Sequence, residues 1–476
     1  MNIPSSIEMI FIDDIIFIGL MYFIMRYYRM SAFRCTKLCK YNMKGMKNMK
    51  KILFALTIFI ASFSFISCNR TEEETLVIWA WNQNVDILED AVDRYKNEVD
   101  SSFNAEVVDF SKSDINTKIT TAAILKDSTD MADIFLGDWI YMRSNYELFP
   151  ELFATLSDDV SDSELLGFPD FAVEVVKNNE DELFALPFGI GPTVTFAYVP
   201  LFEELGYTQE DLEDIQNNGW IWDEYLSIGE SLHELDDNYY MSAYNLSGDD
   251  RIFRTLSSQK GFWFMDKNQN VTIGNDTSQE SLRKVYQMYQ NNVIQHIDSG
   301  DYKSLMIDGK IAAQIQGFWL SGQLKSLAPE QAGDWMILPC PSWSETEKGD
   351  SVTGGSYLYV NNFSESKNEA IDFIKWETMN VENVIRTLEV GGIFPVLKDA
   401  YDDEGFLATD NFFGDHNYLL DVASIVTSAK PIYPSKYNGY NYDVYINAQY
   451  KVLFEDADIP TELSSTATLM INNKDE

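Results

Sequence analysis

Short apolar runs alternate with amphipathic helical patterns early in the chain, and this alternation constrains the fold more than any other feature. Residues 76–81 (Leu-Val-Ile-Trp-Ala-Trp) are a continuous apolar run of strand length, and residues 85–99 repeat apolar side chains at helical spacing. The same alternation follows with a strand at 105–110, a helix over 115–123 and a strand at 134–136. Strands that alternate with helices predict parallel βαβ units and therefore an open α/β sheet.

Polar and aromatic residues follow two of these predicted strands. In open α/β sheets, ligands bind beyond the carboxyl ends of the strands. Trp81 and Asn82 close the first strand, where the next helix begins and its free N–H groups can meet a ligand. Asp138 and Trp139 follow the third strand. We expect all four residues to face a ligand; a cap at the protein surface is the alternative for Asp138 and Trp139.

The amino end carries an export pattern. Lys50 and Lys51 precede an apolar and hydroxyl run over residues 52–67, which ends at Cys68. A basic start, a short apolar core and small residues at the end describe a secretory signal peptide, here residues 49–67. The run is shorter than the roughly 20 residues of a membrane-spanning helix.

The end of this run resembles a bacterial lipobox, whose cysteine is diacylated and becomes the first residue after cleavage. The resemblance lies in residues 65–68 (Phe-Ile-Ser-Cys) and implies lipidation of Cys68. Two acyl chains hold a protein stably at a membrane, and residues 68–75 then form a lipidated tether. The alternative is a plain signal peptide with an incidental cysteine.

Residues 1–48 do not fit this plan and form a doubtful leader. Three methionines, Met43, Met46 and Met49, precede the basic residues, and we expect translation to start at one of them. The alternative is an additional membrane anchor over residues 7–28, where two aspartates near the centre would be costly in lipid.

Acidic residues dominate the chain. It has 35 Lys and Arg against 75 Asp and Glu, a formal net charge of −40. Residues 1–67 hold nine of these bases and three of these acids, so the remainder carries a net charge of −46. We exclude nucleic acid as a partner, because such binding depends on Lys and Arg that neutralise phosphates. A cationic ligand such as a polyamine is an alternative that this charge leaves open.

The exported part has few residues that could hold a metal ion. Of four cysteines, Cys340 alone lies beyond Cys68, so no disulfide or cysteine-type zinc site is available there. The three histidines are scattered along the chain. We therefore expect no metal site and no cofactor.

About 400 residues follow the leader, more than one core usually supports, so we expect two lobes. Short motifs occur along them in a fixed order. They lie at residues 75–97, 132–135 (Ala-Asp-Ile-Phe), 185–189 (Ala-Leu-Pro-Phe-Gly), 220–232, 308–313, 317–319 (Gly-Phe-Trp), 335–341, 354–356 (Gly-Gly-Ser) and 369–376. Together they resemble family 1 extracellular solute-binding proteins, the group that contains the maltodextrin-binding proteins.

The resemblance implies a periplasmic-binding-protein-like type II fold, in which two α/β lobes are joined by three hinge crossings and separated by a cleft. It places the N-terminal lobe at residues 76–190 and 345–392 and the C-terminal lobe at residues 191–344 and 393–476. Proline and glycine, which fix or free the backbone, mark the crossings at residues 189–193, 340–354 and 391–396.

The resemblance also implies a function. Members of the family close their lobes over a solute and deliver it to the permease subunits of an ABC importer. We expect the solute to be a small carbohydrate. We expect the protein to be a monomer, lipid-anchored outside the cytoplasm, that catalyses no reaction.

Further candidates for ligand contact come from the same resemblance. Trp319 of the Gly-Phe-Trp motif is expected to stack on a sugar ring, with a core position near a hinge as its alternative. Gly354 and Gly355 allow the backbone to approach a ligand, unless they form a simple turn. Asp249 follows a strand-like segment of the second lobe, and Tyr440 lies in a late tyrosine-rich stretch.

Other classes of protein stay as alternatives. A glycoside hydrolase needs two carboxylates roughly 5–10 Å apart across a sugar bond, and the sequence marks no such pair. A surface lipoprotein that binds a protein partner would have a filled cleft and an exposed apolar patch. Within the transport class, a receptor for a polyamine or another non-sugar solute is the alternative.

Overall fold

The computed structural model describes residues 75–475, except for 247–249, 298–301, 408–410, 415–416 and 431. The expected leader and signal peptide lie outside the described residues, as do Cys68 and all of the tether but its last residue. Asp249 lies outside them too.

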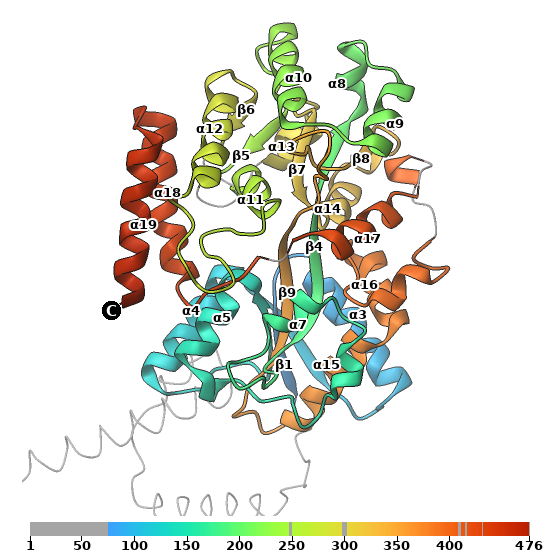
Figure 1. Ribbon diagram of the computed structural model, residues 1–476. Coiled ribbons are helices and arrows are strands. Elements are labelled where there is room, and N and C mark those ends of the chain that lie inside the picture. The colour runs from blue at the N-terminus through green and yellow to red at the C-terminus, as the bar shows by residue number, and fades with distance from the viewer. Residues whose placement is uncertain are drawn as a thin grey trace, which may run out of the picture. The chain divides into compact units, whose positions relative to one another are not determined.

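The predicted alternation of strands and helices forms the start of a mixed sheet (Figure 1). The elements are β1 (Leu76–Ala80), α3 (Asn84–Glu98), β2 (Ala105–Asp109), α4 (Lys112–Leu125) and β3 (Ile134–Asp138). β1 pairs in parallel with β2 on one side and with β3 on the other. The prediction of parallel βαβ units is therefore confirmed.

Two long strands connect this part of the sheet to the rest. β4 (Leu186–Tyr198) and β9 (Val352–Val360) pair antiparallel with each other, and β9 also pairs antiparallel with β3. The far half of β4 pairs with β7 (Ala313–Gly317) and β8 (Trp335–Leu338). All seven strands form one sheet in the order β2-β1-β3-β9-β4-β7, with β8 paired to β4.

The pairing of β4 with β9 is irregular where the sheet passes from one lobe to the other. Its register shifts twice between residues 187 and 192. Such bulges bend and twist a strand locally, and these lie at the predicted crossing 189–193. The predicted second crossing, residues 340–354, overlaps only the start of β9, and in the predicted third crossing, residues 391–396, Phe394 bridges to Ile190.

The third crossing contains glycines because two backbone segments touch there. A Cβ built on Gly322 of α14 (Leu320–Leu327) would lie 2.4 Å from the carbonyl oxygen of Gly391. Gly392 has a φ of +68°, in the left-handed region that favours glycine. Gly392 thereby ends α16 (Val381–Gly391) and directs the chain into the crossing.

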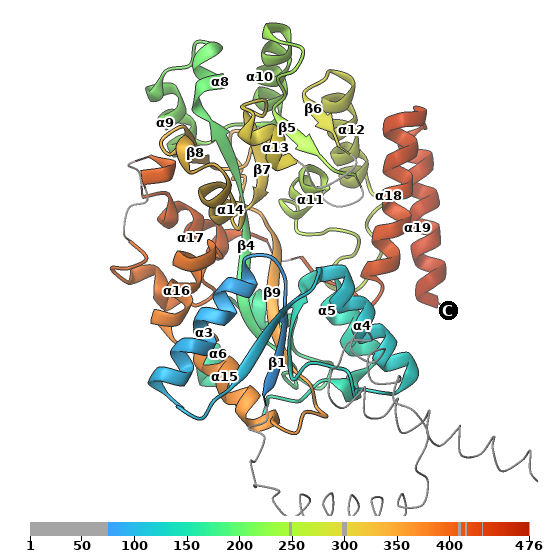
Figure 2. The same ribbon diagram turned by 180° about the vertical axis from the view of Figure 1, so that it is seen from behind.

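The second lobe contains a small parallel sheet and several helices beside β7 and β8 (Figure 2). The sheet consists of β5 (Ser242–Tyr244) and β6 (Ile294–His296). The helices are α8 (Val199–Glu204), α9 (Gln209–Asn218), α10 (Trp222–Leu235), α11 (Arg251–Ser258), α12 (Asp276–Gln290) and α13 (Tyr302–Ile307).

The remaining helices cover the first lobe and the sides of the cleft. They are α5 (Trp139–Leu148), α6 (Asp162–Leu165), α7 (Asp170–Glu174), α15 (Lys367–Met379), α17 (Tyr418–Ser428), α18 (Asn438–Glu455) and α19 (Ile459–Asp475). Short 3-10 turns occur at η2 (Pro150–Leu152), η3 (Pro329–Gln331), η4 (Lys398–Asp402) and η5 (Asn411–Phe413). α18 packs along α19 and contacts both α12 of the second lobe and α5 of the first (Figures 1 and 2). Within the described ranges, no helix is both long and apolar enough to span a membrane.

Candidate functional site

A cavity of about 600 Å³ lies between the lobes, within the range of about 300–1,000 Å³ that small-ligand sites occupy. The first lobe contributes the loop after β1, the end of β3 and the start of α5, and the second lobe contributes α11, α13 and α14. β4 and β9 line the cavity at the crossing. It brings together seven of the predicted ligand residues, which are Trp81, Asn82, Asp138, Trp139, Trp319, Gly354 and Gly355.

The tyrosine-rich stretch reaches the cavity through a different residue from the one predicted. Tyr440 is 38% exposed and lies outside the wall, whereas Tyr442 is 8% exposed and lines it. Both belong to α18, and two positions along a helix turn the side chain by about 200°. Asp249 lies outside the described residues, so its contact with a ligand stays a prediction.

The loop between β1 and α3 turns sharply at the cavity. Asn82 has a φ of +51°, a left-handed conformation that asparagine adopts more readily than most residues. Nδ2 of Asn84 donates a hydrogen bond to the carbonyl oxygen of Trp81 at 3.0 Å. These two features hold Trp81 and Asn82 in place at the end of the strand.

Asp138 and Lys112 form a charged pair on the same wall. The Ser111 hydroxyl accepts a hydrogen bond from the backbone N–H of Asp114 at 3.0 Å, which fixes the start of α4 at Lys112. Nζ of Lys112 lies 3.1 Å from Oδ2 of Asp138. Burial, and then the charge of Asp138, raises the pKa of the Tyr141 hydroxyl, which therefore stays protonated as a donor at neutral pH.

The indole of Trp319 lies against three glycines at the crossing between the lobes. A Cβ would come within 2.4 Å of the ring at Gly191 on β4, 2.2 Å at Gly317 on β7 and 2.8 Å at Gly354 on β9. A larger residue at any of these positions would have to displace the ring, because carbon atoms in contact are about 3.5–4.0 Å apart. Trp319 is thus a packing residue at the crossing and part of the cavity wall at once. Its stacking on a ligand stays a prediction.

Two arginines of α11 complete the wall of the second lobe, and no sequence pattern had indicated them. Arg251 donates to the carbonyl oxygen of Thr353 at 2.7 Å and to its hydroxyl oxygen at 2.6 Å. The guanidinium of Arg251 also lies over the indole of Trp319, 5.0 Å from the ring centroid. Arg251 therefore joins α11 to β9 and restrains the indole.

Arg254 lies one turn further along α11, among aromatic rings. Its Nη2 is 2.5 Å from Oδ1 of Asp250, and both side chains are almost fully buried. Its guanidinium lies 4.6, 5.8 and 6.0 Å from the ring centroids of Trp263, Tyr442 and Trp139 respectively. Because Trp139 belongs to the first lobe, this cluster spans the cleft.

A pair of glutamines joins the lobes beside the cavity. Nε2 of Gln323 on α14 donates to Oε1 of Gln83 at 3.0 Å, and Nε2 of Gln83 donates to the carbonyl oxygen of Trp319 at 3.4 Å. Gln83 stands just before α3 of the first lobe. The two lobes therefore touch across the cleft in this conformation.

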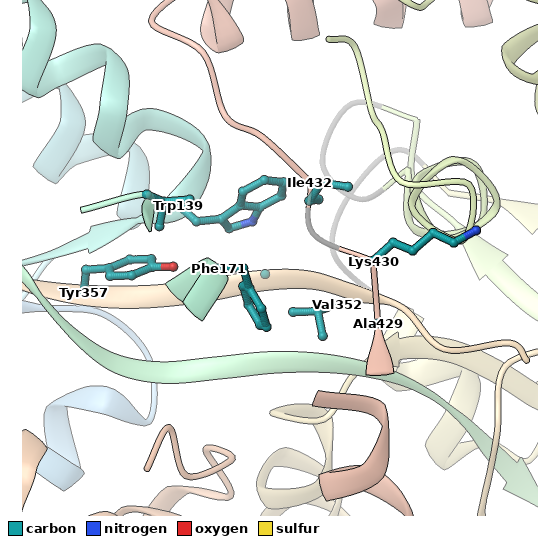
Figure 3. A pocket seen from close by; sticks show the side chains of 9 residues that line it. Trp139, Phe171, Val352, Tyr357, Ala429, Lys430 and Ile432 are labelled. Atoms are coloured by element: carbon teal, nitrogen blue, oxygen red, sulfur yellow. The ribbon is translucent and has the colours of Figure 1, made fainter. Parts of the chain in front are cut away.

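A second, much smaller cavity of about 20 Å³ lies next to Trp139 (Figure 3). Its lining is mostly apolar and includes Phe171, Val352 and Ile432, and Lys430 extends away from the indole. This space can hold about one water molecule, which is too little for an organic ligand. We therefore regard it as packing space behind Trp139 and assign ligand binding to the larger cavity.

The larger cavity combines indole rings with amide, hydroxyl and charged groups. This combination suits a ligand that has apolar faces and polar edges. In the part of the chain that the structure describes, no three His, Cys, Asp or Glu side chains are grouped so that they could hold a metal ion.

Known proteins resemble this chain over most of its length. The family described as "Bacterial extracellular solute-binding protein" matches residues 90–414. A lactose-binding protein of Rhizobium radiobacter is 25% identical over 379 residues, which cover 78% of this chain and 85% of that protein. An arabinooligosaccharide-binding protein of Halalkalibacterium halodurans is 24% identical over 373 residues, which cover 74% and 79% of the two chains.

The fold is also similar to solved structures. One is the ABC transporter associated binding protein from B. animalis subsp. lactis Bl-04 in complex with beta-1,6-galactobiose. It has a TM-score of 0.69 and 19% sequence identity, over 84% of this chain and 97% of that chain. The predicted two-lobed type II fold is therefore confirmed.

Proposed function

Because the chain belongs to the bacterial extracellular solute-binding proteins, we propose that it is a receptor that captures a carbohydrate between its lobes and delivers it to an ABC importer. The observation that carries the proposal is the cavity between the lobes, where Trp81, Trp139 and Trp319 stand among hydrogen-bonding groups. Indole faces pack on the apolar faces of sugar rings, while amides and carboxylates bind hydroxyl groups. The relatives named for lactose and arabinooligosaccharides support a carbohydrate as the ligand.

The proposed ligand contacts are distributed over both lobes. The tryptophans supply flat apolar surfaces, the polar residues bind hydroxyl groups, and the glycines of β9 let the ligand approach the backbone. The set consists of Trp81, Asn82, Asp138, Trp139, Asp249, Trp319, Gly354 and Gly355, with Tyr442 in place of Tyr440.

We propose that the ligand is enclosed by rotation of the lobes about the three crossings. Hinge motions of this kind concentrate the change in a few backbone angles. One body then comprises residues 76–190 and 345–392, and the other comprises residues 191–344 and 393–476. A bound ligand that contacts both bodies favours the closed population, which the importer would recognise.

Members of this family are extracellular proteins, so the chain acts outside the cytoplasm. We propose that diacylated Cys68 holds a monomer at the membrane and that the protein catalyses no reaction. The relatives that match the chain are named as binding proteins, which supports a receptor.

Thermal unfolding of the purified protein with saccharides, polyols and polyamines tests the proposal. A ligand present at about 100 times its Kd raises the free energy of unfolding by about 2.7 kcal/mol. A saccharide that stabilises the protein and is recovered unmodified supports a receptor. A saccharide that is consumed would indicate an enzyme, and stabilisation by polyamines alone would reject a carbohydrate ligand.

A further inference from the structure

One end of the first lobe carries most of the strongly exposed apolar side chains. β1, β2 and β3 begin at this end and β9 ends there, because β1 pairs in parallel with its neighbours and β9 pairs antiparallel with β3. Among the described residues, seven large apolar side chains are more than half exposed, and five of the seven lie at this end. We call this surface the end face, and its five apolar residues are Val99, Ile124, Leu125, Leu148 and Phe363.

These residues come from four separate connections that the sheet brings together. Val99 follows α3 and leads into β2, whose first residue pairs with the first residue of β1. Ile124 and Leu125 end α4, in the connection to β3. Leu148 ends α5, which begins at the cavity and runs away from it, and Phe363 follows the end of β9.

Hydrogen bonds join these connections to the start of β1. Oδ2 of Asp133 accepts from the backbone N–H of Val77 at 2.7 Å, and the Ser364 hydroxyl donates to Oδ1 of Asp133 at 2.6 Å. Nδ2 of Asn104 donates to the Thr75 hydroxyl at 2.6 Å. Thr75, where the predicted tether joins the fold, therefore lies at the end face (Figure 1).

The tether is short. Residues 68–74 span at most roughly 25 Å when fully extended, so an anchor at Cys68 would keep the end face within that distance of the membrane. A link of this length makes contact between the end face and the lipid an intramolecular event, at an effective concentration in about the millimolar range. Apolar contacts too weak to hold a free protein at a membrane are then sufficient.

Charged residues of the same end limit the kind of lipid surface that fits. Residues 72–74 of the tether are all glutamate. The connections at the end face carry exposed charged side chains as well, which are Glu98, Asp127, Asp130, Glu365, Lys96 and Lys126. Carboxylates outnumber ammonium groups in this set, so headgroups with a net negative charge would repel it. Burial of apolar side chains, rather than charge attraction, must drive the contact.

We propose that the end face rests on the lipid headgroup surface of the membrane that holds the anchor. The inference rests on the proposed diacylation of Cys68. The apolar side chains enter the interfacial layer, where binding grows with the apolar area buried. α3 has 15 residues and runs about 22 Å from the cavity to the end face. A docked protein therefore holds its cavity away from the lipid, where solutes can reach it.

Fluorescence of the lipidated mature protein in phosphatidylcholine vesicles tests the inference. Leu125→Cys provides one site for a polarity-sensitive thiol probe, because Cys340 is buried and the sulfur of Cys68 would carry the lipid. Leu235→Cys is the matched control, since Leu235 is 49% exposed and ends α10, at the opposite end of the fold from the start of β1 (Figure 1). Brominated acyl chains should quench the probe at residue 125 at least about twofold more than the probe at residue 235.

A double variant, Ile124→Ser with Leu125→Ser, tests the apolar side chains themselves. Both positions are exposed, so the unfolding midpoint should stay unchanged. With the probe on Leu148→Cys, the equilibrium should shift about fivefold or more toward the undocked form. Phosphatidylglycerol in the vesicles should weaken the docking, and salt should restore part of it.

The outcomes separate this inference from the receptor function. Equal quenching of the probes at residues 125 and 235 would overturn the docking, and an unchanged equilibrium in the serine variant would overturn the role of the apolar side chains. A blue shift at residue 125 that brominated lipid does not quench, and that grows with protein density, would indicate a second copy of this chain on the end face instead of lipid. Mass spectrometry that finds no acyl chains on Cys68 would reject the anchor and the docking together, while saccharide binding tests the receptor separately.

Discussion

Gly317→Ala tests whether the Trp319 indole is confined as the structure indicates. The added Cβ would lie 2.2 Å from the ring, so the two groups must separate by about 1.3 Å to reach ordinary contact. The backbone of Gly317 is fixed by its pairing with Thr193, and Arg251 restrains the ring through its bonds to Thr353. We expect the free energy of unfolding to fall by about 1–3 kcal/mol, as for other overpacked sites.

The same substitution should weaken ligand binding, since the displaced indole is part of the cavity wall. Loss of one aromatic contact should weaken the binding free energy by about 1–3 kcal/mol, which corresponds to an increase in Kd of about five- to 150-fold. Urea unfolding followed by tryptophan fluorescence measures stability, and calorimetric titration with a bound saccharide measures affinity.

Gly439→Ala is the matched control for this experiment. Gly439 lies in α18, and its added Cβ would be 3.7 Å from the Tyr141 ring, an ordinary contact. Alanine in place of glycine within a helix should raise stability by up to about 1 kcal/mol. Equal unfolding midpoints and equal affinities for the two variants would refute the confinement of the indole.

Three other predictions concern single residues, which are the half-buried Trp319 and the buried Glu377 and Cys340. Trp319→Ala should lower the free energy of unfolding by about 2 kcal/mol and weaken saccharide binding; lost stability with unchanged Kd would make Trp319 purely structural. Burial raises the pKa of Glu377 to about 8, although Arg94 lies 3.2 Å away. The protonated carboxyl group therefore contributes fully to the free energy of unfolding below about pH 4, and this contribution is lost as the pH rises to about 8. Glu377→Gln should remove that pH dependence of the urea midpoint, and an unchanged slope would contradict the assignment. Cys340 is buried and its pKa is raised by burial, so peptide mapping should find it alkylated by iodoacetamide only after unfolding; rapid modification of the native protein would argue against this burial.

The early strands and helices were predictable because their apolar spacing is local. The run 76–81 and the helical pattern 85–99 correspond to β1 and α3 within a residue or two. The position of β9 between β3 and β4 was not predictable in this way, because local spacing does not identify a distant partner. Gly354 and Gly355 lie within β9 rather than in a turn, and Gly354 is required by the neighbouring Trp319 ring.

The cavity residues that follow the ends of strands were predictable from the sequence. The cavity residues whose burial depends on tertiary packing were missed. Arg251 and Arg254 lie on a short helix, and no neighbouring residue in the sequence indicates the rings that surround Arg254. The sequence does contain a pattern that indicates Tyr442. The residues 442, 445, 449 and 452 recur at helical spacing and are all buried, which favours Tyr442 over Tyr440 for an inward position.

The interleaving of the two lobes along the sequence determines when each of them can be completed. β3 and its surroundings pair with a segment that is synthesised far later, as in the hydrogen bond from Nδ2 of Asn361 to the carbonyl oxygen of Ala132, 229 positions earlier. Contacts of such long range close large loops and slow folding. A newly made chain therefore holds an incomplete first sheet, with the edge of β3 open, until residues 191–344 of the second lobe and then β9 have been synthesised.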